Sequence, residues 1–353
     1  MTTFGEWREY GDSLGRFASI REKAETPMDR IVVQNNAGIQ KVVAGDFGKT
    51  LIVTIGPTNQ PDSRAVVSAR LFLTTLKTLK GKGEAELRVT DKGLTIQTSF
   101  GSTIQMDNLE GAFTFLKPAP YVAGEGVTVR FPENFLPEAA KYLVSTGDFA
   151  PFKQVLAQGN GKEMYFKSAD DHIQATVGPL SADTKATVHF PDHVFPALRG
   201  LSAAGGIYIP EHTGSQVHQA QFGAGKYRVV TVILPNYGKF PAVAEYEYTV
   251  RVHGDKKLLT DTFKSLAGRH QFSRVVMEAR DGTFTIRSGD SGAATLNIEC
   301  EGTGSLPVNA AFMAKVLQTV DGKTATVQFA DSPSRVRIIG EKNLWPILVA
   351  AMK

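Results

Sequence analysis

Residues 64–98 read RAVVSARLFLTTLKTLKGKGEAELRVTDKGLTIQT, and this stretch contains the unit from which the chain is built. It begins with the apolar, β-branched run AVV, which is typical of a strand. Phe72, Leu76 and Leu79 follow at positions i, i+4 and i+7, the spacing that places side chains on one face of a helix. Two runs that alternate apolar and polar residues then flank the turn Asp91-Lys92-Gly93, which predicts a hairpin. The stretch therefore predicts a strand, a short helix and a pair of antiparallel strands in succession.

The same pattern recurs later in the chain. Phe195 and Phe312 occupy places equivalent to Phe72, at a spacing of roughly 120 residues, which is longer than the period of solenoid repeats. A second set of amphipathic segments lies upstream of each of these helical stripes, at Trp7–Ile20, Asn134–Val144 and Lys257–Ala267. The chain thus predicts an α+β fold of three similar domains, each with antiparallel sheets and two short helices, over residues 1–118, 119–244 and 245–353.

The composition is that of an ordinary globular protein. Of the 353 residues, 42% are hydrophobic and 21% are charged, and no apolar run approaches the ~20 residues that cross a bilayer. The first residues, MTTFGEWREYG, lack the basic and apolar regions of a secretory signal. Cys300 is the single cysteine, which excludes an internal disulfide framework and a cysteine-cluster metal site. We therefore expect a soluble, cytoplasmic protein with several domains.

The positions of the positive charges are more informative than their sum. The net charge of +4, from 39 basic and 35 acidic residues, is too small to identify a polyanionic partner. When each predicted helix is drawn at 100° per residue, at least one basic side chain lies opposite or beside the apolar stripe. These basic residues are Arg8, Arg16, Arg70, Lys77, Lys141, Arg199, Lys257, Lys264 and Lys315.

Such faces would contact phosphates without reading bases, and the contacts would weaken as the salt concentration rises. The alternative is that lysine and arginine simply populate solvated helix faces, which also carry Asp12, Glu138 and Asp261.

Two short motifs resemble catalytic or phosphate-binding sequences but lack the context that those sites need. Gly289-Asp290-Ser291-Gly292 resembles the nucleophile segment of trypsin-like proteases, yet the disulfides and the histidine context of that family are missing. The segment Gly45–Thr50 resembles a phosphate-binding loop, but Val43 stands where that motif needs a glycine, and strand-like runs flank the segment on both sides. Both motifs are therefore predicted to be hairpin turns.

The titratable residues form no recognisable metal or catalytic motif. The pair Asp170-Asp171 is typical of a solvated turn. The seven histidines lack HExxH or comparable ligand spacing; they are His172, His189, His193, His212, His218, His253 and His270. We therefore predict no catalytic residues, no metal and no cofactor, and we do not expect an enzyme.

Over its whole length the chain resembles one family in the order and spacing of degenerate motifs. Residues 64–98 resemble the second half of that family's first domain, and IQATVGPL at 173–180 stands where the family carries an ATDGHRL-like segment. LPNYGKFP at 234–241 resembles its turn into the third domain, while 306–313 and 345–353 resemble its last helix and its terminal strand. The family is the bacterial-type DNA polymerase III beta subunit, the processivity sliding clamp, and the chain resembles a divergent member.

The resemblance implies a DNA clamp fold that forms a ring. Two protomers would associate head to tail, so that six domains surround a channel lined by twelve helices whose basic faces point at duplex DNA. Loose, sequence-nonspecific contacts would let the ring slide in the nucleoid while topology keeps a DNA polymerase on its template. In this homodimer, Ile104 and Met106 of one protomer's strand would pair with the other protomer near Leu266.

The resemblance also implies a pocket between the second and third domains that takes short peptides of a polymerase, a clamp loader and other partners. Carried over motif by motif, the pocket would be lined by Leu156, Thr176, Gly178, Pro179, Leu180, Pro241, Tyr246, Ile347 and Val349. Pro179-Leu180 replaces the family's His-Arg pair, and Val349-Ala350-Ala351 replaces its Met-Pro-Met. The partner motif would therefore differ from the usual one, and an ordinary interdomain core is the alternative for these residues.

Two other functions stay open at the level of sequence. One is a clamp-like scaffold without a replicative role, and the other is a β-rich virion or assembly protein whose repeat is architectural. A virion protein would need neither basic helix faces nor a peptide pocket.

Overall fold

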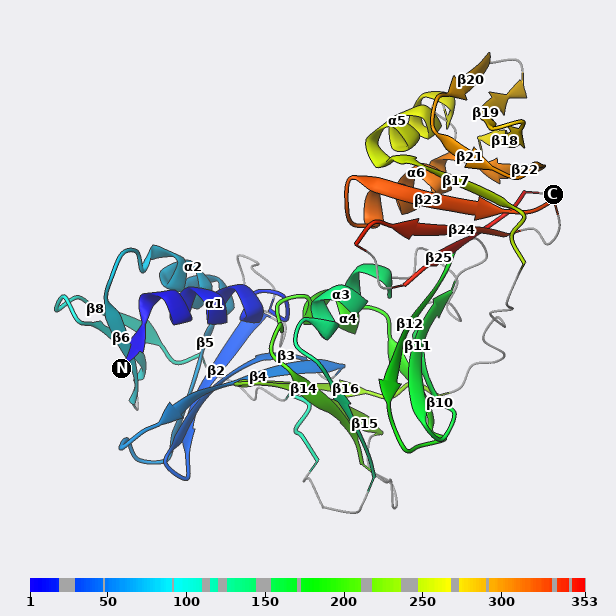
Figure 1. Cartoon of the computed structure of the whole chain (residues 1–353). Coiled ribbons are helices and arrows are strands. Elements are labelled where there is room, and N and C mark those ends of the chain that lie inside the picture. Colours follow the sequence, from blue (N-terminus) through cyan, green and yellow to red (C-terminus); the bar gives the residue numbers. More distant parts are fainter. Residues whose placement is uncertain are drawn as a thin grey trace. The chain divides into compact units, whose positions relative to one another are not determined.

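The computed structural model describes residues 1–18, 29–46, 48–90, 92–109, 115–119, 126–143, 154–169, 173–210, 218–235, 247–267, 273–289, 292–331, 335–342 and 345–352. The chain forms two compact units. Unit 1 comprises Met1–Ala140, Gly159–Met164 and Leu180–Pro235, and unit 2 comprises Lys141–Gln158, Tyr165–Pro179 and Asn236–Lys353. Each unit consists of antiparallel sheets with a few short helices, so the predicted α+β fold is confirmed (Figure 1).

Unit 1 contains two antiparallel sheets. The larger has the order β5-β2-β3-β4-β16-β15-β14-β9, and its strands are β2 (Arg30–Asn36), β3 (Ile39–Gly45), β4 (Lys49–Pro57), β5 (Ser63–Ser68), β9 (Val127–Phe131), β14 (Gly205–Ile209), β15 (Gln219–Ala224) and β16 (Tyr227–Val232). The smaller has the order β1-β6-β7-β8, and its strands are β1 (Thr2–Thr3), β6 (Glu84–Thr90), β7 (Gly93–Thr98) and β8 (Thr103–Asp107). In the larger sheet β4 pairs with β16, with Val53 opposite Tyr227, so strands from the first two predicted domains share one sheet.

Two helices of unit 1 pack against each other. They are α1 (Phe4–Leu14) and α2 (Ala69–Thr78). A Cβ atom on Gly11 of α1 would lie 3.3 Å from Cδ1 of Leu76, so the glycine allows the close approach of the two helices.

The first helix begins earlier than predicted. A capping box sets its start: Thr3 Oγ1 accepts the backbone N–H of Glu6, and the Glu6 carboxylate accepts the backbone N–H of Thr3. The helix ends at Leu14, with Gly15 as its C-cap, so the predicted range Trp7–Ile20 starts and ends too late in the sequence.

The remaining helices of the described chain agree with the predicted segments. These are α3 (Phe135–Tyr142), α4 (Val194–Leu198, after strand β13 at Thr187–Pro191), α5 (Lys256–Ala267) and α6 (Ala310–Thr319). Asn309 caps α6 by accepting hydrogen bonds from the backbone N–H groups of Ala311 and Phe312, at 2.9 and 3.3 Å.

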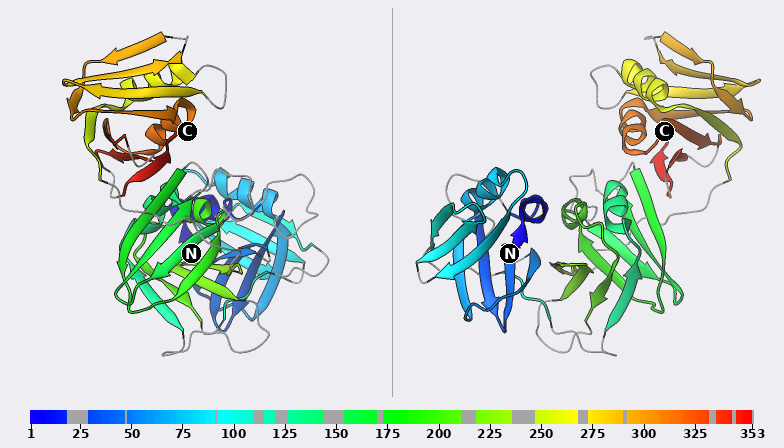
Figure 2. Two further views of the ribbon diagram at one scale, coloured as in Figure 1. Left: turned by 90° about the vertical axis from the view of Figure 1, so that its right-hand side faces the viewer. Right: turned by 60° about the vertical axis from the view of Figure 1, so that its left-hand side comes forward.

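Unit 2 is also built from antiparallel sheets. In one sheet eight neighbouring strands follow the order β10-β11-β12-β25-β24-β23-β17-β21; they are β10 (Gln154–Gly159), β11 (Glu163–Ala169), β12 (Ile173–Ser181), β17 (Val250–Asp255), β21 (Glu299–Glu301), β23 (Thr324–Phe329), β24 (Arg335–Gly340) and β25 (Ile347–Ala350). The other follows β20-β19-β18-β22, with β18 (Arg274–Arg280), β19 (Thr283–Ser288), β20 (Gly292–Leu296) and β22 (Gly304–Asn309). Figure 2 shows α5 and α6 side by side against the strands of this unit.

Aromatic side chains fill the cores of both units. In unit 1 the rings of Phe190, Phe195 and Phe222 lie with their centroids 5.4–6.2 Å apart, and Phe72 is fully buried. In unit 2 Phe263, Phe284 and Phe329 are fully buried, whereas the repeated Phe312 is half-buried. Of the three phenylalanines at the predicted spacing of roughly 120 residues, Phe72 and Phe195 are therefore buried and Phe312 is only half-buried.

The phosphate-loop-like segment is a hairpin turn, as predicted. It joins β3 to β4, and Asp46 Oδ1 accepts the backbone N–H groups of Gly48 and Lys49 at 2.7 and 2.9 Å. Residues Asp290 and Ser291 lie outside the described residues, as do Asp170 and Asp171. None of the described helices combines the length and apolar character needed to cross a membrane.

Replacing Phe72 with alanine is expected to lower the free energy of unfolding by about 3–5 kcal/mol, because the ring is fully buried and its loss leaves a cavity. Leu71→Ala is the matched control: Leu71 is the preceding residue of the same helix and is 48% exposed, so a change of about 0.5 kcal/mol or less is expected. Urea denaturation of both variants checks the prediction, and equal losses would contradict the packing described for α2.

Candidate nucleic-acid interface and peptide groove

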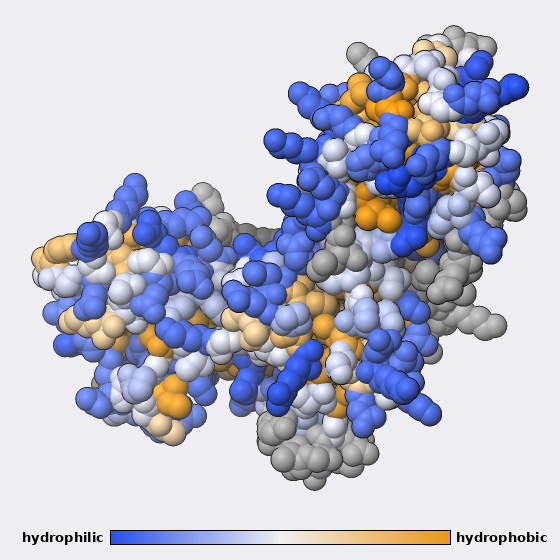
Figure 3. All heavy atoms as spheres, viewed as in Figure 1, coloured by the Kyte–Doolittle hydropathy of each residue, from blue (hydrophilic) through white to orange (hydrophobic). Residues whose placement is uncertain are grey.

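In unit 1 the predicted basic residues of α1 and α2 are exposed. Arg8 lies on α1, Arg16 follows the end of that helix, and Arg70 and Lys77 lie on α2. The opposite faces of the two helices are buried, since Trp7 and its helical neighbours point into the core. Figure 3 shows hydrophilic residues over this part of the molecule.

The side chain of Arg16 lies close to the backbone next to Arg199, although the two residues are distant in sequence. A Cβ atom on Gly200 would lie 2.9 Å from Nη1 of Arg16, so the guanidinium group lies directly over that glycine. Arg199 is exposed, forms the C-cap of α4 and donates a hydrogen bond from Nη2 to the carbonyl oxygen of Ala140 at 3.3 Å. Arg16 thus lies beside the residue that follows Arg199, although the two arginines are distant in sequence.

A polar network holds α1 against the turn between β15 and β16. Lys226 Nζ donates hydrogen bonds to the hydroxyl of Tyr10 at 2.8 Å and to Glu6 Oε1 at 3.0 Å, and Tyr227 donates from its hydroxyl to Glu9 Oε1 at 2.8 Å. The hydrogen bond to Tyr10, followed by that to Glu6, raises the pKa of Lys226. The hydrogen bond from Lys226 lowers the pKa of Glu6, so both groups are charged near neutral pH. The network fixes the helix that carries Arg8.

In unit 2 the predicted basic side chains differ in how exposed they are to solvent. Lys257 and Lys264 are exposed on α5, and Lys315 is exposed on α6. Lys141 is instead half-buried, and its Nζ lies 2.6 Å from Oδ2 of Asp321. Its charge is therefore already paired with a carboxylate, which sequence reasoning could not anticipate because the two residues are 180 positions apart.

The predicted peptide pocket is only partly accessible. Leu156, Leu180, Ile347 and Val349 are buried, at 6% exposure or less, so their side chains belong to the core. Thr176 and Gly178 are half-buried and Pro179 is exposed, and all three lie along β12. Pro241 and Tyr246 lie outside the described residues. We call the three accessible residues Thr176, Gly178 and Pro179 the β12 groove wall.

Trp345 positions this wall and was not among the predicted pocket residues. Its indole Nε1 donates a hydrogen bond to the carbonyl oxygen of Gly178 at 2.7 Å, and its ring packs edge-on against Tyr142 with the centroids 5.7 Å apart. Strand β25 follows it and pairs with β12, with Ile347 opposite Ala175. The sequence contained a signal for this role, since an aromatic residue with one N–H donor usually finds a partner when buried.

The residues predicted for the ring joint have different environments. Strand β8 is the end strand of its sheet, and on it Ile104 is half-buried whereas Met106 is 1% exposed. Leu266 is half-buried on α5. Met106 therefore packs inside unit 1, Ile104 is partly accessible, and Thr103, Gln105 and Asp107 are the exposed side chains of this strand.

Among the described residues, no group of three or more histidine, cysteine, aspartate or glutamate side chains is placed to hold a metal ion. His189 is buried, His253 is half-buried with Nδ1 2.9 Å from Thr326 Oγ1, and His193 and His218 are exposed. The other three histidines lie outside the described residues.

Comparison with known proteins gives a match at the level of structure. No family model matches the chain, and no curated protein sequence matches it. The DNA polymerase III beta subunit of Thermotoga maritima superposes with a TM-score of 0.78 at 14% identity, covering 100% of this chain and 98% of that one. The beta subunit of Pseudomonas aeruginosa gives 0.76 at 15% identity, covering 100% and 99%. The beta clamp of Helicobacter pylori, solved with a DNA ligase peptide, gives 0.73 at 15% identity, covering 100% and 99%.

These structures match the chain from end to end, although only 14–15% of the residues are identical. The predicted resemblance is thus confirmed for the fold: the chain has the fold of the DNA polymerase III beta subunit, the sliding clamp.

Proposed function

We propose that the chain is a DNA sliding clamp, a processivity factor that encircles duplex DNA as a head-to-tail homodimeric ring. The observation that carries this proposal is the end-to-end match to clamp structures, together with exposed basic residues on the helices. Each protomer would contribute three domains, over 1–118, 119–244 and 245–353, and six helices. The protein would act in the cytoplasm at the nucleoid, as a binding protein rather than an enzyme.

The proposed DNA-facing residues are the exposed cations Arg8, Arg16, Arg70, Lys77, Arg199, Lys257, Lys264 and Lys315. Lys141 is set apart from this group because its Nζ lies 2.6 Å from Oδ2 of Asp321. Long, mobile side chains around a duplex give weak contacts to phosphates, which carry no base information and so allow sliding. We keep Lys141 as a member of the same surface whose charge is offset by its neighbour.

We further propose that partner proteins bind a short peptide segment along the β12 groove wall. The Helicobacter pylori clamp was solved with a DNA ligase peptide, which supports a peptide-binding role for this fold. In this chain Pro179 and the half-buried Thr176 and Gly178 would contact the peptide, while Leu156, Ile347 and Val349 form the apolar support beneath. A DNA polymerase and a clamp loader are the expected partners.

The ring is tested by loading the full chain onto nicked circular DNA with its cognate loader. We expect the protein to remain on the circle and to leave after linearisation, because topology rather than affinity retains it. In parallel, the mass in solution should be twice the chain mass of 38.2 kDa. Equal loss from circles and linear DNA, or a stable monomer at micromolar concentration, would overturn the proposal.

Reversing the charges of Lys77, Lys257 and Lys264 to glutamate should weaken DNA binding and flatten its salt dependence. Each lost phosphate contact should reduce the slope of log affinity against log salt by about 0.9. The matched control reverses Lys92, Lys162 and Lys342, which are exposed outside the helices and change the net charge equally. Equal effects of the two triple variants, measured by titration with duplex DNA, would refute the assignment of the helix faces.

Trp345→Phe should reduce stimulation of the cognate polymerase, since Gly178 would lose its indole donor and the β12 groove wall its fixed position. The stability cost of one unsatisfied carbonyl is about 1–3 kcal/mol. Trp7→Phe is the matched control, because Trp7 makes the corresponding bond to the Ala85 carbonyl at 3.1 Å in unit 1. Processive primer extension should fall for Trp345→Phe and not for Trp7→Phe; a similar fall in both would argue against the groove.

A further inference from the structure

The edge of strand β6 that faces β1 has a strand partner over two residues only. Thr2 pairs with Ala85 and Thr3 with Glu84, and there β1 ends. On its other side β6 pairs with β7 from Ala85 to Thr90. Among the described strands, none continues the ladder of β1 along Leu87–Thr90.

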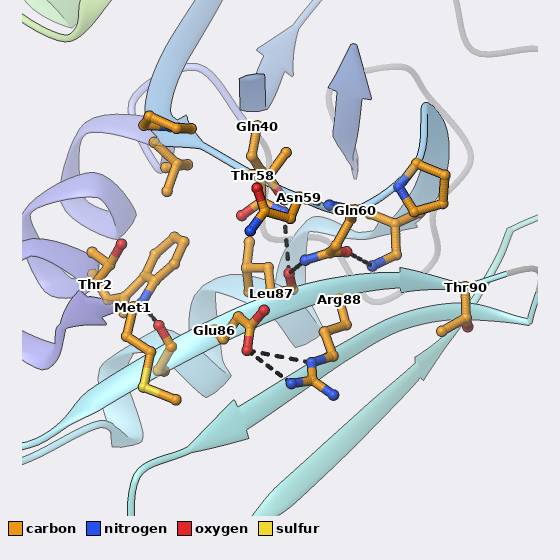
Figure 4. Close-up of a pocket in the computed structure, with 17 residues that line it drawn as sticks. Met1, Thr2, Gln40, Thr58, Asn59, Gln60, Glu86, Leu87, Arg88 and Thr90 are labelled. Carbon is orange, nitrogen blue, oxygen red and sulfur yellow. Dashed lines mark hydrogen bonds and ion pairs between the residues drawn. The ribbon is translucent and has the colours of Figure 1, made fainter. Parts of the chain in front are cut away.

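A side-chain amide occupies the place of the missing strand. Gln60 Nε2 donates a hydrogen bond to the Leu87 carbonyl at 2.7 Å, and Gln60 Oε1 accepts the backbone N–H of Val89 at 3.1 Å (Figure 4). Gln40 Nε2 adds a second donor to the Leu87 carbonyl, at 3.1 Å. The carboxamide of Gln60 therefore bonds the same two backbone groups that a neighbouring peptide chain would bond.

A pocket of about 720 Å³ lies in front of this edge. Its walls are the start of β1 at Met1 and Thr2, the segment from Ile55 to Pro61, and β6 from Ala85 to Thr90 (Figure 4). The wall opposite β6 carries Thr58 and Asn59, so the lining is largely polar. The pocket therefore suits an extended peptide that forms hydrogen bonds with the backbone of β6 better than it suits an apolar ligand.

Arg88 supplies a charge on this strand edge. Its guanidinium group donates from Nε and Nη2 to Glu86 Oε2 at 3.3 and 3.1 Å, and its side chain is 53% exposed. An arginine has five N–H donors, so donors remain for a second carboxylate. On an antiparallel partner strand, the residue opposite Arg88 would therefore favour aspartate or glutamate.

We infer that the edge of β6 from Leu87 to Thr90 is a second peptide-binding site, distinct from the β12 groove wall. Its ligand is an extended segment of a partner protein that runs antiparallel to β6, in line with β1, and carries an acidic residue opposite Arg88. The segment displaces the Gln60 carboxamide and takes over its bonds to Leu87 and Val89, as in β-strand addition at other sheet edges. This site does not depend on ring formation or on DNA binding.

The test uses the full chain and the synthetic peptide acetyl-Thr-Val-Glu-Val-amide, whose glutamate falls opposite Arg88 and whose last valine falls opposite Leu87. We expect a dissociation constant of about 1 mM, as befits a four-residue ligand, and slower hydrogen–deuterium exchange in the segment 84–90. Gln60→Ala should tighten binding about threefold or more, because the competing carboxamide is gone. Asn59→Ala is the matched control and should leave the affinity unchanged, since it removes a pocket residue that does not bond β6.

Two further comparisons separate strand addition from weak surface adsorption. Methylating the nitrogen of the last valine removes the donor for the Leu87 carbonyl and should abolish binding. Arg88→Glu should weaken the glutamate peptide about 2- to 5-fold and favour its lysine analogue by a similar factor. If the 84–90 segment is not protected at about 10 mM peptide, or if the methylated peptide binds equally, Gln60 only caps the edge against aggregation and the inference is overturned.

Discussion

The main-chain ladder between β4 and β16 is the constraint on which unit 1 depends. It runs from the pair Val53–Tyr227 to the pair Lys49–Thr231 and merges strands far apart in sequence into one sheet. Because this sheet buries the apolar stripes of its helices, the opposite helix faces are left to solvent and carry the charges. The contacts of α1 with Lys226 and Tyr227 then fix the first helix against the same strand pair. The orientation of Arg8 is thus a result of sheet pairing, and no acidic partner is needed to set it.

Sequence periodicity predicted the α+β class and most helices because these signals are local. The stripe Phe72, Leu76 and Leu79 predicted α2, and all three side chains are buried. The start of α1 was missed because a capping box between Thr3 and Glu6 begins the helix before its first apolar stripe is evident. Boundaries of this kind depend on a few polar bonds rather than on the hydrophobic pattern.

The candidate site was less accessible to sequence reasoning, because its properties depend on residues that are remote in the chain. Lys141 was grouped with the other basic residues on helix faces, and its pairing with Asp321 follows only from the packing of unit 2. Val349 and Ile347 were correctly taken as apolar, yet their burial leaves β12 to provide the accessible wall. Gln60 carries no motif at all; its position against Leu87 depends on how the segment after β4 folds back over β6.

The two tryptophans of the chain have matching environments, one in each unit. Trp7 and Trp345 are both buried, each donates its indole N–H to a backbone carbonyl, and each lies edge-on to a tyrosine, Tyr10 or Tyr142. The tryptophan fluorescence of the chain therefore comes from one residue in each unit, and no added label is needed. In a chain that retains only one of them, the emission spectrum reports the opening of one unit while the other remains spectroscopically silent.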